Sequence, residues 1–322
     1  MEFEQRTDLG QLNAAVERIK NTIGSVVIGQ QSMIELLITG ILADGHMLIE
    51  GVPGVAKTLT AKLIARCIDA RYSRIQFTPD LMPSDVLGTS VFNPGNASFE
   101  FKKGPVFGNI ILVDEINRAP AKTQSALFEV MEERQVTIDG KTYVMEEPFI
   151  VLATQNPVEQ EGTYRLPEAQ LDRFLFKIEV KYPSLEEETA ILHRQHQQHT
   201  SVQVGEIAPV LTSGEIYAYR KQVKAFHVEP NILSFVAKIT YETRNNKSLF
   251  LGGSPRASLA IVNGAKAMAA IRGRDFVTPD DVIAVAPAVL RHRIILTPDK
   301  EMEGAAPDDV ILQIINKLEV PR

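Results

Sequence analysis

Residues 51–58 have the composition of a phosphate-binding loop. They read Gly-Val-Pro-Gly-Val-Ala-Lys-Thr and lie between an apolar run and a segment of helical periodicity. Small residues let backbone N–H groups close around phosphate oxygens, and the start of the next helix adds a favourable dipole. Lys57 would then reach the terminal phosphates, and the Thr58 hydroxyl would ligate Mg²⁺. The predicted nucleotide contacts here are Gly51, Val52, Pro53, Gly54, Val55, Ala56, Lys57, Thr58 and Leu59.

Ala56 departs from the general pattern of such loops, which has glycine at this position. A Cβ atom is tolerated there only if the residue has a negative φ, as in the first turn of a helix. We therefore expect Ala56 to have that conformation.

Two further apolar runs end in polar residues suited to hydrolysis. The first ends in Asp114 and Glu115, of which Asp114 would hold Mg²⁺ through water and Glu115 would act as general base toward the attacking water. The second ends in Thr-Gln-Asn-Pro, where Asn156 could orient that water between Glu115 and the γ-phosphate. A simple polar turn residue is the alternative for Asn156. Together these residues predict an ATPase that uses Mg²⁺.

Short apolar runs alternate with helical segments through the first part of the chain, which is typical of a parallel sheet covered on both faces. Beyond Pro183 the periodicity is mostly helical. We predict a doubly wound α/β core, with an N-terminal helix, in residues 1–183 and a smaller all-α domain in residues 184–322. The predicted strands are 46–50, 72–77, 109–114, 149–154 and 174–178, the predicted core helices are 12–23, 31–42 and 58–70, and hairpins are predicted at 90–101 and 135–144.

The composition is that of an ordinary globular protein. Among 322 residues, 44% are hydrophobic and 23% are charged, and the net charge is −6. This acidic balance does not suggest a binder of nucleic-acid backbones. The single cysteine, Cys67, lies in an apolar run and is expected to be buried. No apolar run approaches the roughly 20 residues that span a bilayer, and we expect a cytoplasmic protein.

The combined motifs resemble those of AAA+ ATPases, and among these most closely the MoxR family. The resemblance runs from about Val27 to the end of the chain, and alanine at position 56 is usual in that family. It implies an AAA+ core followed by a helical lid domain. The matching segments beyond the phosphate loop are Asp-Glu-Ile-Asn-Arg-Ala at 114–119, Ala-Thr-Gln-Asn-Pro at 153–157, Leu-Pro-Glu-Ala-Gln-Leu-Asp-Arg-Phe at 166–174 and Gly-Gly-Ser-Pro-Arg-Ala at 252–257.

The resemblance also implies roles for individual residues. Arg173 matches the arginine finger, which contacts the γ-phosphate held by the neighbouring subunit, and Arg165 is a second candidate for a subunit contact. Arg256 matches the second sensor arginine at the start of a lid helix; the sequence leaves open whether it serves its own nucleotide or the neighbour's. Ile28 matches the residue that packs on the adenine base. By family analogy the subunits would form a homo-oligomer, most simply a hexameric ring.

The activity implied by the resemblance is ATP-driven remodelling of a partner protein during metal-cofactor insertion or complex maturation. In this family the partner often contains a von Willebrand factor A domain. A DNA-acting motor is one alternative, but its hairpins should be basic, whereas the first predicted hairpin carries Glu100 and no base before Lys102. A regulatory scaffold that hydrolyses ATP only slowly is the other alternative.

Three histidines lie at intervals of three residues, at His193, His196 and His199. On a helix, neighbours at this spacing can share a metal ion, but no carboxylate or cysteine completes the set. A polar helix face is the preferred interpretation, with a metal site as the alternative.

Overall fold

A five-stranded parallel sheet forms the core, in the order β10-β1-β9-β6-β3. The computed structural model describes residues 8–157, 163, 164, 166–197 and 207–321. All five predicted strands are confirmed, and their carboxyl ends meet along one edge of the sheet. The strands are β1 (His46–Gly51), β3 (Tyr72–Gln76), β6 (Ile110–Asp114), β9 (Ile150–Gln155) and β10 (Phe174–Val180).

Helices cover both faces of this sheet, so the predicted doubly wound arrangement is confirmed. Along β6, Ile110 and Leu112 pack into one apolar cluster, whereas Ile111 and Val113 pack into a second cluster on the opposite face. The first cluster includes residues of α1 (Gly10–Gly24), α2 (Gln31–Leu42) and α3 (Lys57–Arg66). The second includes residues of α4 (Pro83–Leu87), η1 (Pro105–Phe107), η2 (Ile116–Arg118) and α5 (Ala121–Glu133).

The helix predicted at 58–70 is wrong at its carboxyl end. α3 ends at Arg66, and β2 (Ile68–Asp69) follows, paired in parallel with β11 (Leu211–Thr212). The carbonyl of Cys67 accepts hydrogen bonds from the N–H groups of Val210 and Leu211 at 2.7 and 3.1 Å. Because this partner lies far away in the sequence, local periodicity could not reveal the pairing. Cys67 itself is buried, as expected.

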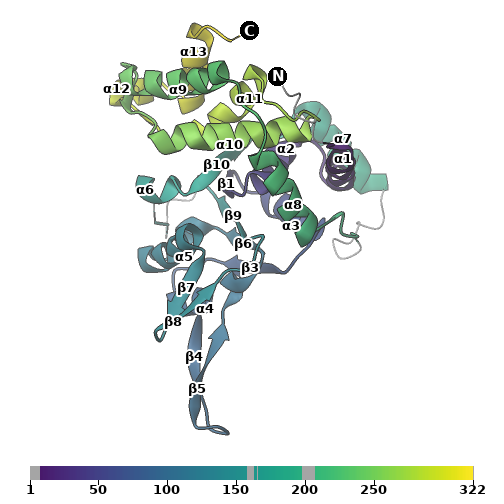
Figure 1. Cartoon of the computed structure of the whole chain (residues 1–322), viewed down its shortest axis with the longest axis vertical. Helices are drawn as coiled ribbons and strands as arrows, with labels where there is room; N and C mark the ends of the chain where they lie inside the picture. Colours follow the sequence, from purple (N-terminus) through teal and green to yellow (C-terminus); the bar gives the residue numbers. More distant parts are fainter. Residues whose placement is uncertain (1–7, 158–162, 165, 198–206, 322) are drawn as a thin grey trace.

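Two antiparallel hairpins extend from the core where the sequence predicts them. They consist of β4 (Gly88–Asn93) with β5 (Ser98–Lys103), and of β7 (Gln135–Ile138) with β8 (Lys141–Val144). The β4–β5 hairpin projects away from the rest of the molecule (Figure 1). At their bases the two hairpins touch, with the rings of Phe101 and Tyr143 4.7 Å apart.

The chain beyond Val180 is mostly helical, as predicted, with β11 and one short antiparallel pair added. The long helix α10 lies across the top of the sheet, over β1 and β10 (Figure 1). Within the described residues, no helix combines the length and the apolar character needed to cross a bilayer. The elements are α7 (Leu185–Gln197), α8 (Ser213–Lys224), α9 (Pro230–Asn245), β12 (Leu249–Leu251), α10 (Pro255–Ile271), α11 (Pro279–Leu290), β13 (Ile295–Leu296), α12 (Pro298–Met302) and α13 (Pro307–Lys317).

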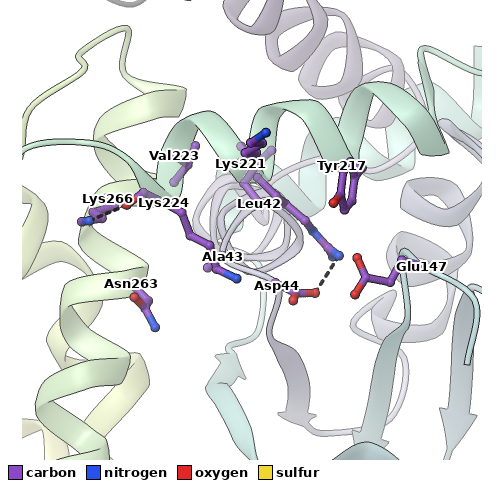
Figure 2. A pocket seen from close by; sticks show the side chains of 11 residues that line it. Leu42, Ala43, Asp44, Glu147, Tyr217, Lys221, Val223, Lys224, Asn263 and Lys266 are labelled. Atoms are coloured by element: carbon purple, nitrogen blue, oxygen red, sulfur yellow. Dashed lines mark hydrogen bonds and ion pairs between the residues drawn. The ribbon is translucent and has the colours of Figure 1, made fainter. Parts of the chain in front are cut away.

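A buried arginine, Arg220, joins α8 to the core. The guanidinium of Arg220 is 2.6 Å from the carboxylate of Asp44 and donates to the carbonyl of Ile41 at the end of α2. A cavity of about 320 Å³ opens beside this pair, and its wall also includes Glu147 and Lys266 (Figure 2). None of the residues that the sequence analysis singles out lines it.

A buried histidine at the start of β1 joins this strand to α5 and β9. Neutral His46 donates from Nε2 to the carbonyl of Met131 at 3.1 Å and accepts at Nδ1 from the N–H of Val151 at 3.0 Å. Burial, with a smaller contribution from Arg134, lowers the pKa of His46 to about 4. A proton on Nδ1 would remove the bond from Val151, so the folded state disfavours protonation.

We therefore predict that His46 makes stability depend on pH between 6.5 and about 4. Above that window His46 is neutral in both the folded and the unfolded state, so its contribution is fully present. As pH falls through the window the unfolded state takes up a proton first, which costs about 3 kcal/mol by the lower end. Urea unfolding at several pH values should give a shallower dependence for His46→Gln. His193→Gln, on the exposed surface of α7, should keep the wild-type dependence; equal slopes for His46→Gln and wild type would contradict the prediction.

Candidate active site

A cleft of about 560 Å³ lies at the carboxyl ends of the parallel strands, where open α/β sheets bind ligands. The loop between β1 and α3 forms one wall, and the ends of β3, β6 and β9 form the other. Most of the predicted site residues meet here. The cleft is lined by Pro53, Gly54, Val55, Ala56, Lys57, Thr58, Leu59, Arg74, Gln76, Asp114, Glu115, Thr154, Gln155 and Asn156.

The expectation that Ala56 has a negative φ is wrong. Its φ is 61° and its ψ is 21°, which places it in the left-handed region just before α3 begins. The loop makes its last turn at this residue, before the helix starts, so helical geometry does not yet apply. Gly54 also has a positive φ, of 87°. The left-handed conformation of Ala56 is strained because the residue is not glycine.

We predict that Ala56→Gly raises the free energy of unfolding by up to about 1 kcal/mol. Glycine removes a left-handed strain of about 1–2 kcal/mol, and the greater freedom of the unfolded chain cancels part of this gain. Ala190→Gly, in the exposed middle of α7, is the matched control and should lower stability by about 1 kcal/mol. Chemical denaturation of both variants tests the prediction, which fails if Ala56→Gly is destabilised as much as the control.

Lys57, Thr58 and Asp114 line the cleft and are hydrogen-bonded within it. The ammonium of Lys57 donates to the loop carbonyls of Gly51 and Val52. The Thr58 hydroxyl donates to Asp114 Oδ1 at 2.9 Å, and Asp114 is almost fully buried. Hydroxyl and carboxylate oxygens are ligands that Mg²⁺ prefers, so this pair fits the ion that the sequence predicts.

Glu115 lies at the mouth of the cleft in a strained conformation. It is not glycine, yet its φ is 56°. Its N–H donates to the hydroxyl of Thr154 at 3.0 Å, and that hydroxyl donates to Asp114 at 3.2 Å. Asn156 lines the same cleft from the end of β9 and is 6% exposed. The two strand ends are thus joined by Thr154, and the acid and the amide share one cavity.

Three polar side chains in and beside the cleft were not found from the sequence. Arg74 donates from Nε to Asp114 Oδ2 at 2.6 Å, and this bond raises the pKa of Arg74 above its ordinary value. Gln76 donates to the carboxylate of Glu115 at 2.9 Å, and Arg118 pairs with the same carboxylate at 3.2 Å. Gln76 pairs in register with Asp114 on β6. The available signal was that Arg74 and Gln76 are polar residues two positions apart at the end of a predicted strand. This spacing predicts no contact with Asp114 or Glu115 until β6 is known to be the neighbouring strand.

Arg173 and Arg256 lie outside this cleft and share one carboxylate. Arg173 follows α6 (Glu168–Leu171), and its Nε is 3.6 Å from Glu132 Oε2. The guanidinium of Arg256, at the start of α10, is 3.4 Å from Glu132 Oε1 and 3.8 Å from Asp172. Arg256 is 64% exposed. Neither arginine is among the residues that line the cleft of its own subunit.

The remaining predicted residues lie elsewhere. Ile28 is on the turn between α1 and α2, half-buried, and is not among the residues lining the cleft. Arg165 and His199 lie outside the described residues. In the part of the chain that the structure describes, no group of three or more histidine, cysteine or acidic side chains could hold a metal ion.

Comparison with known proteins identifies the family. Residues 46–176 match the ATPase family associated with various cellular activities (AAA), and residues 241–314 match the AAA lid domain. The chain is 44% identical to Chaperone MoxR1 of Mycobacterium tuberculosis over 95% of this chain and 82% of that protein. This chain belongs to the MoxR family of AAA+ ATPases.

Other relatives match this chain over most of its length. The crystal structure of a putative ATPase from Cytophaga hutchinsonii superposes with a TM-score of 0.87 at 40% identity, covering 97% of both chains. A more distant relative, the magnesium-chelatase 38 kDa subunit of Acidiphilium rubrum, is 24% identical over 79% of this chain and 71% of that protein. Membership implies nucleotide binding by a core and lid of the kind described above.

Proposed function

We propose that this MoxR protein hydrolyses ATP, with Mg²⁺, at sites shared between neighbouring subunits of a ring. The observation that carries the proposal is the separation of two groups of residues. Lys57, Thr58, Asp114, Glu115 and Asn156 meet in one cleft, whereas Arg173 and Arg256 share Glu132 outside it. Neither Arg173 nor Arg256 of a lone subunit therefore lies at the γ-phosphate position of that subunit's own cleft. A neighbouring subunit can supply one of these arginines there.

Each cleft residue has a distinct task in this proposal. Lys57 leaves the loop carbonyls and neutralises the terminal phosphates. Thr58 directly, and Asp114 through water, would hold Mg²⁺, which would neutralise phosphate charge. Glu115 takes the proton of the attacking water, and Asn156 holds that water in line. Arg173 of the neighbouring subunit stabilises the charge that develops on the γ-phosphate, and Arg256 assists from the same side. The adenine base would lie toward Ile28.

The work driven by hydrolysis is, in our proposal, the remodelling of a partner protein. The β4–β5 hairpin projects from the core with an exposed aromatic pair, Phe92 at 49% and Phe99 at 72% exposed, whose rings are 5.4 Å apart. Such a surface favours contact with a protein. It does not favour a nucleic-acid backbone, because Glu100 is the only charged residue at the tip. The relative named a chaperone supports the same role.

A role in metal-cofactor insertion or complex maturation is the finer part of the proposal. It is supported by the similarity to a magnesium-chelatase subunit. We propose that the client or its adaptor contains a von Willebrand factor A domain.

The proposal is tested by capturing the client in the ATP-bound state. Glu115→Gln with ATP should retain a von Willebrand factor A protein or a metalloenzyme from native lysate, identified by mass spectrometry. The matched control carries Lys57→Ala as well and should retain neither. Retention of nucleic acid with replication proteins would overturn the chaperone role. Negligible ATP turnover by the wild-type ring, with or without the captured client, would favour a regulatory scaffold instead.

A further inference from the structure

The turn that carries Arg173 lies between an exposed helix and Phe174, which is fully buried in the core. The preceding helix, α6, buries none of its side chains, and Asp172 and Arg173 form a turn before β10. β10 is an edge strand of the sheet, so the backbone groups on its outer side have no neighbouring strand. An arginine that must reach a phosphate on another subunit needs a backbone fixed to within about 0.5 Å. Core packing fixes the turn on the Phe174 side, and polar contacts are needed to fix it on the other side.

Arg293, in the turn after α11, supplies that support. Its side chain is 5% exposed. Its Nε donates to the Asp172 carboxylate at 2.7 Å, and its two terminal nitrogens donate to the carbonyls of Asp172, Phe174 and Leu175 at 3.1, 2.7 and 3.2 Å. A fifth bond goes to the carbonyl of Val289. A guanidinium has five N–H donors, so all of them are used.

The acceptors of Arg293 lie on both sides of Arg173 in the sequence. Asp172 precedes the finger residue, and Phe174 and Leu175 follow it, while Arg173 itself is left to face Glu132. The other oxygen of Asp172 lies 3.8 Å from Arg256. The buried guanidinium of Arg293 thus holds the backbone on both sides of Arg173. It also holds the carboxylate of Asp172, which is one of the two acids near Arg256.

A purely structural contact would not need this residue type. Burial of a guanidinium is costly and lowers the pKa of Arg293, and the bond to Asp172 offsets part of that cost. An apolar side chain could fill the same volume more cheaply. The planar set of donors is suited to fixing several carbonyl groups of one turn in a defined geometry.

We propose that Arg293 is a positioning residue for hydrolysis in trans: it fixes the Arg173 turn to the lid, so that Arg173 can enter the cleft of the neighbouring subunit. This inference rests on the proposed shared site. An Arg293 variant should therefore fail to place its own Arg173 in the cleft of the neighbouring subunit. Its own cleft should still hydrolyse ATP when a neighbour supplies an intact Arg173.

Mixed rings separate these two defects. Arg293→Met alone should lower turnover about 10- to 100-fold, with ATP affinity unchanged within about threefold. Co-assembly with Glu115→Gln should raise turnover at least twofold above either variant alone, because the Glu115→Gln subunits present intact fingers to intact Arg293→Met clefts. Co-assembly of Arg293→Met with Arg173→Ala should give no rescue, because neither subunit supplies a finger.

Two controls make the result specific. Arg291, in the same turn, also donates to β10, at Lys177, and pairs with Asp308, away from Arg173. Arg291→Met should therefore keep turnover within about threefold of wild type. Co-assembly of Arg173→Ala with Glu115→Gln tests the shared site itself: no rescue there would overturn the proposed function.

Rescue of Arg173→Ala together with failure to rescue Arg293→Met would overturn the present inference alone. If Arg293→Met does not fold or assemble, Asp172→Asn removes the carboxylate anchor at nearly constant volume. It should show the same loss and the same rescue by Glu115→Gln. Wild-type turnover by a folded Arg293→Met ring, or an Asp172→Asn ring that Glu115→Gln fails to rescue, would also overturn the inference.

Discussion

Arg173→Ala is expected to lower ATP turnover by about 10³ while ATP affinity stays within about threefold of wild type. The loss is large because the arginine would stabilise charge that exists only in the transition state. Affinity is preserved because Arg173 does not line the cleft of its own subunit. Steady-state hydrolysis measured beside nucleotide binding by titration gives both quantities.

The dependence of ATP turnover on protein concentration gives a second test of the role of Arg173. Turnover per wild-type subunit should rise as dilute subunits assemble into rings, whereas the low turnover of Arg173→Ala should stay flat. Fold stability should change little, because the pair with Glu132 is 3.6 Å long and partly exposed. Arg71→Ala, which breaks an exposed pair with Glu146, is the matched control and should behave as wild type. Hydrolysis at the wild-type rate by Arg173→Ala would contradict the shared site.

Much of the cleft could be predicted because its signals are local. The strand that ends in Asp114 and Glu115 is an uninterrupted apolar run, and β6 is buried along its whole length. A glycine-containing loop between strand and helix needs no distant partner to be identified. Once the strands are parallel and adjacent, their polar ends must meet at one edge, which brings Asn156 beside Glu115.

What could not be predicted depends on contacts between segments far apart in the sequence. Gln76 and Arg74 contact the acids only because β3 pairs with β6 in one register. The end of α3 at Arg66 depends on β11, more than a hundred residues away. The positive φ of Ala56 is set by the path of the whole loop. The position of Arg256 beside Arg173 requires the lid to be placed against the core.

Glu115→Gln is expected to bind ATP and to lower its hydrolysis by about 10²–10⁴. The amide cannot accept the proton of the attacking water. It is nearly the same size as the carboxylate, and its oxygen can still accept from Gln76. The bond from the backbone N–H of Glu115 to Thr154 is unaffected, so the cleft should keep its shape. Single-turnover hydrolysis with Mg²⁺, together with an ATP-binding titration, separates chemistry from binding.

The strain at Glu115 makes this variant more informative than one elsewhere in the cleft. A left-handed φ of 56° is costly for a non-glycine residue and persists only where the surroundings fix it, here through Thr154 on the neighbouring strand. The strained backbone places the Glu115 side chain in the cleft, so the variant changes a group that lies at the proposed reaction site. Glu129→Gln, on the exposed face of α5, is the matched control and should hydrolyse ATP normally. If Glu115→Gln hydrolysed ATP as fast as that control, Glu115 would not be the general base. The contacts of its carboxylate with Gln76 and Arg118 would then have a structural role only.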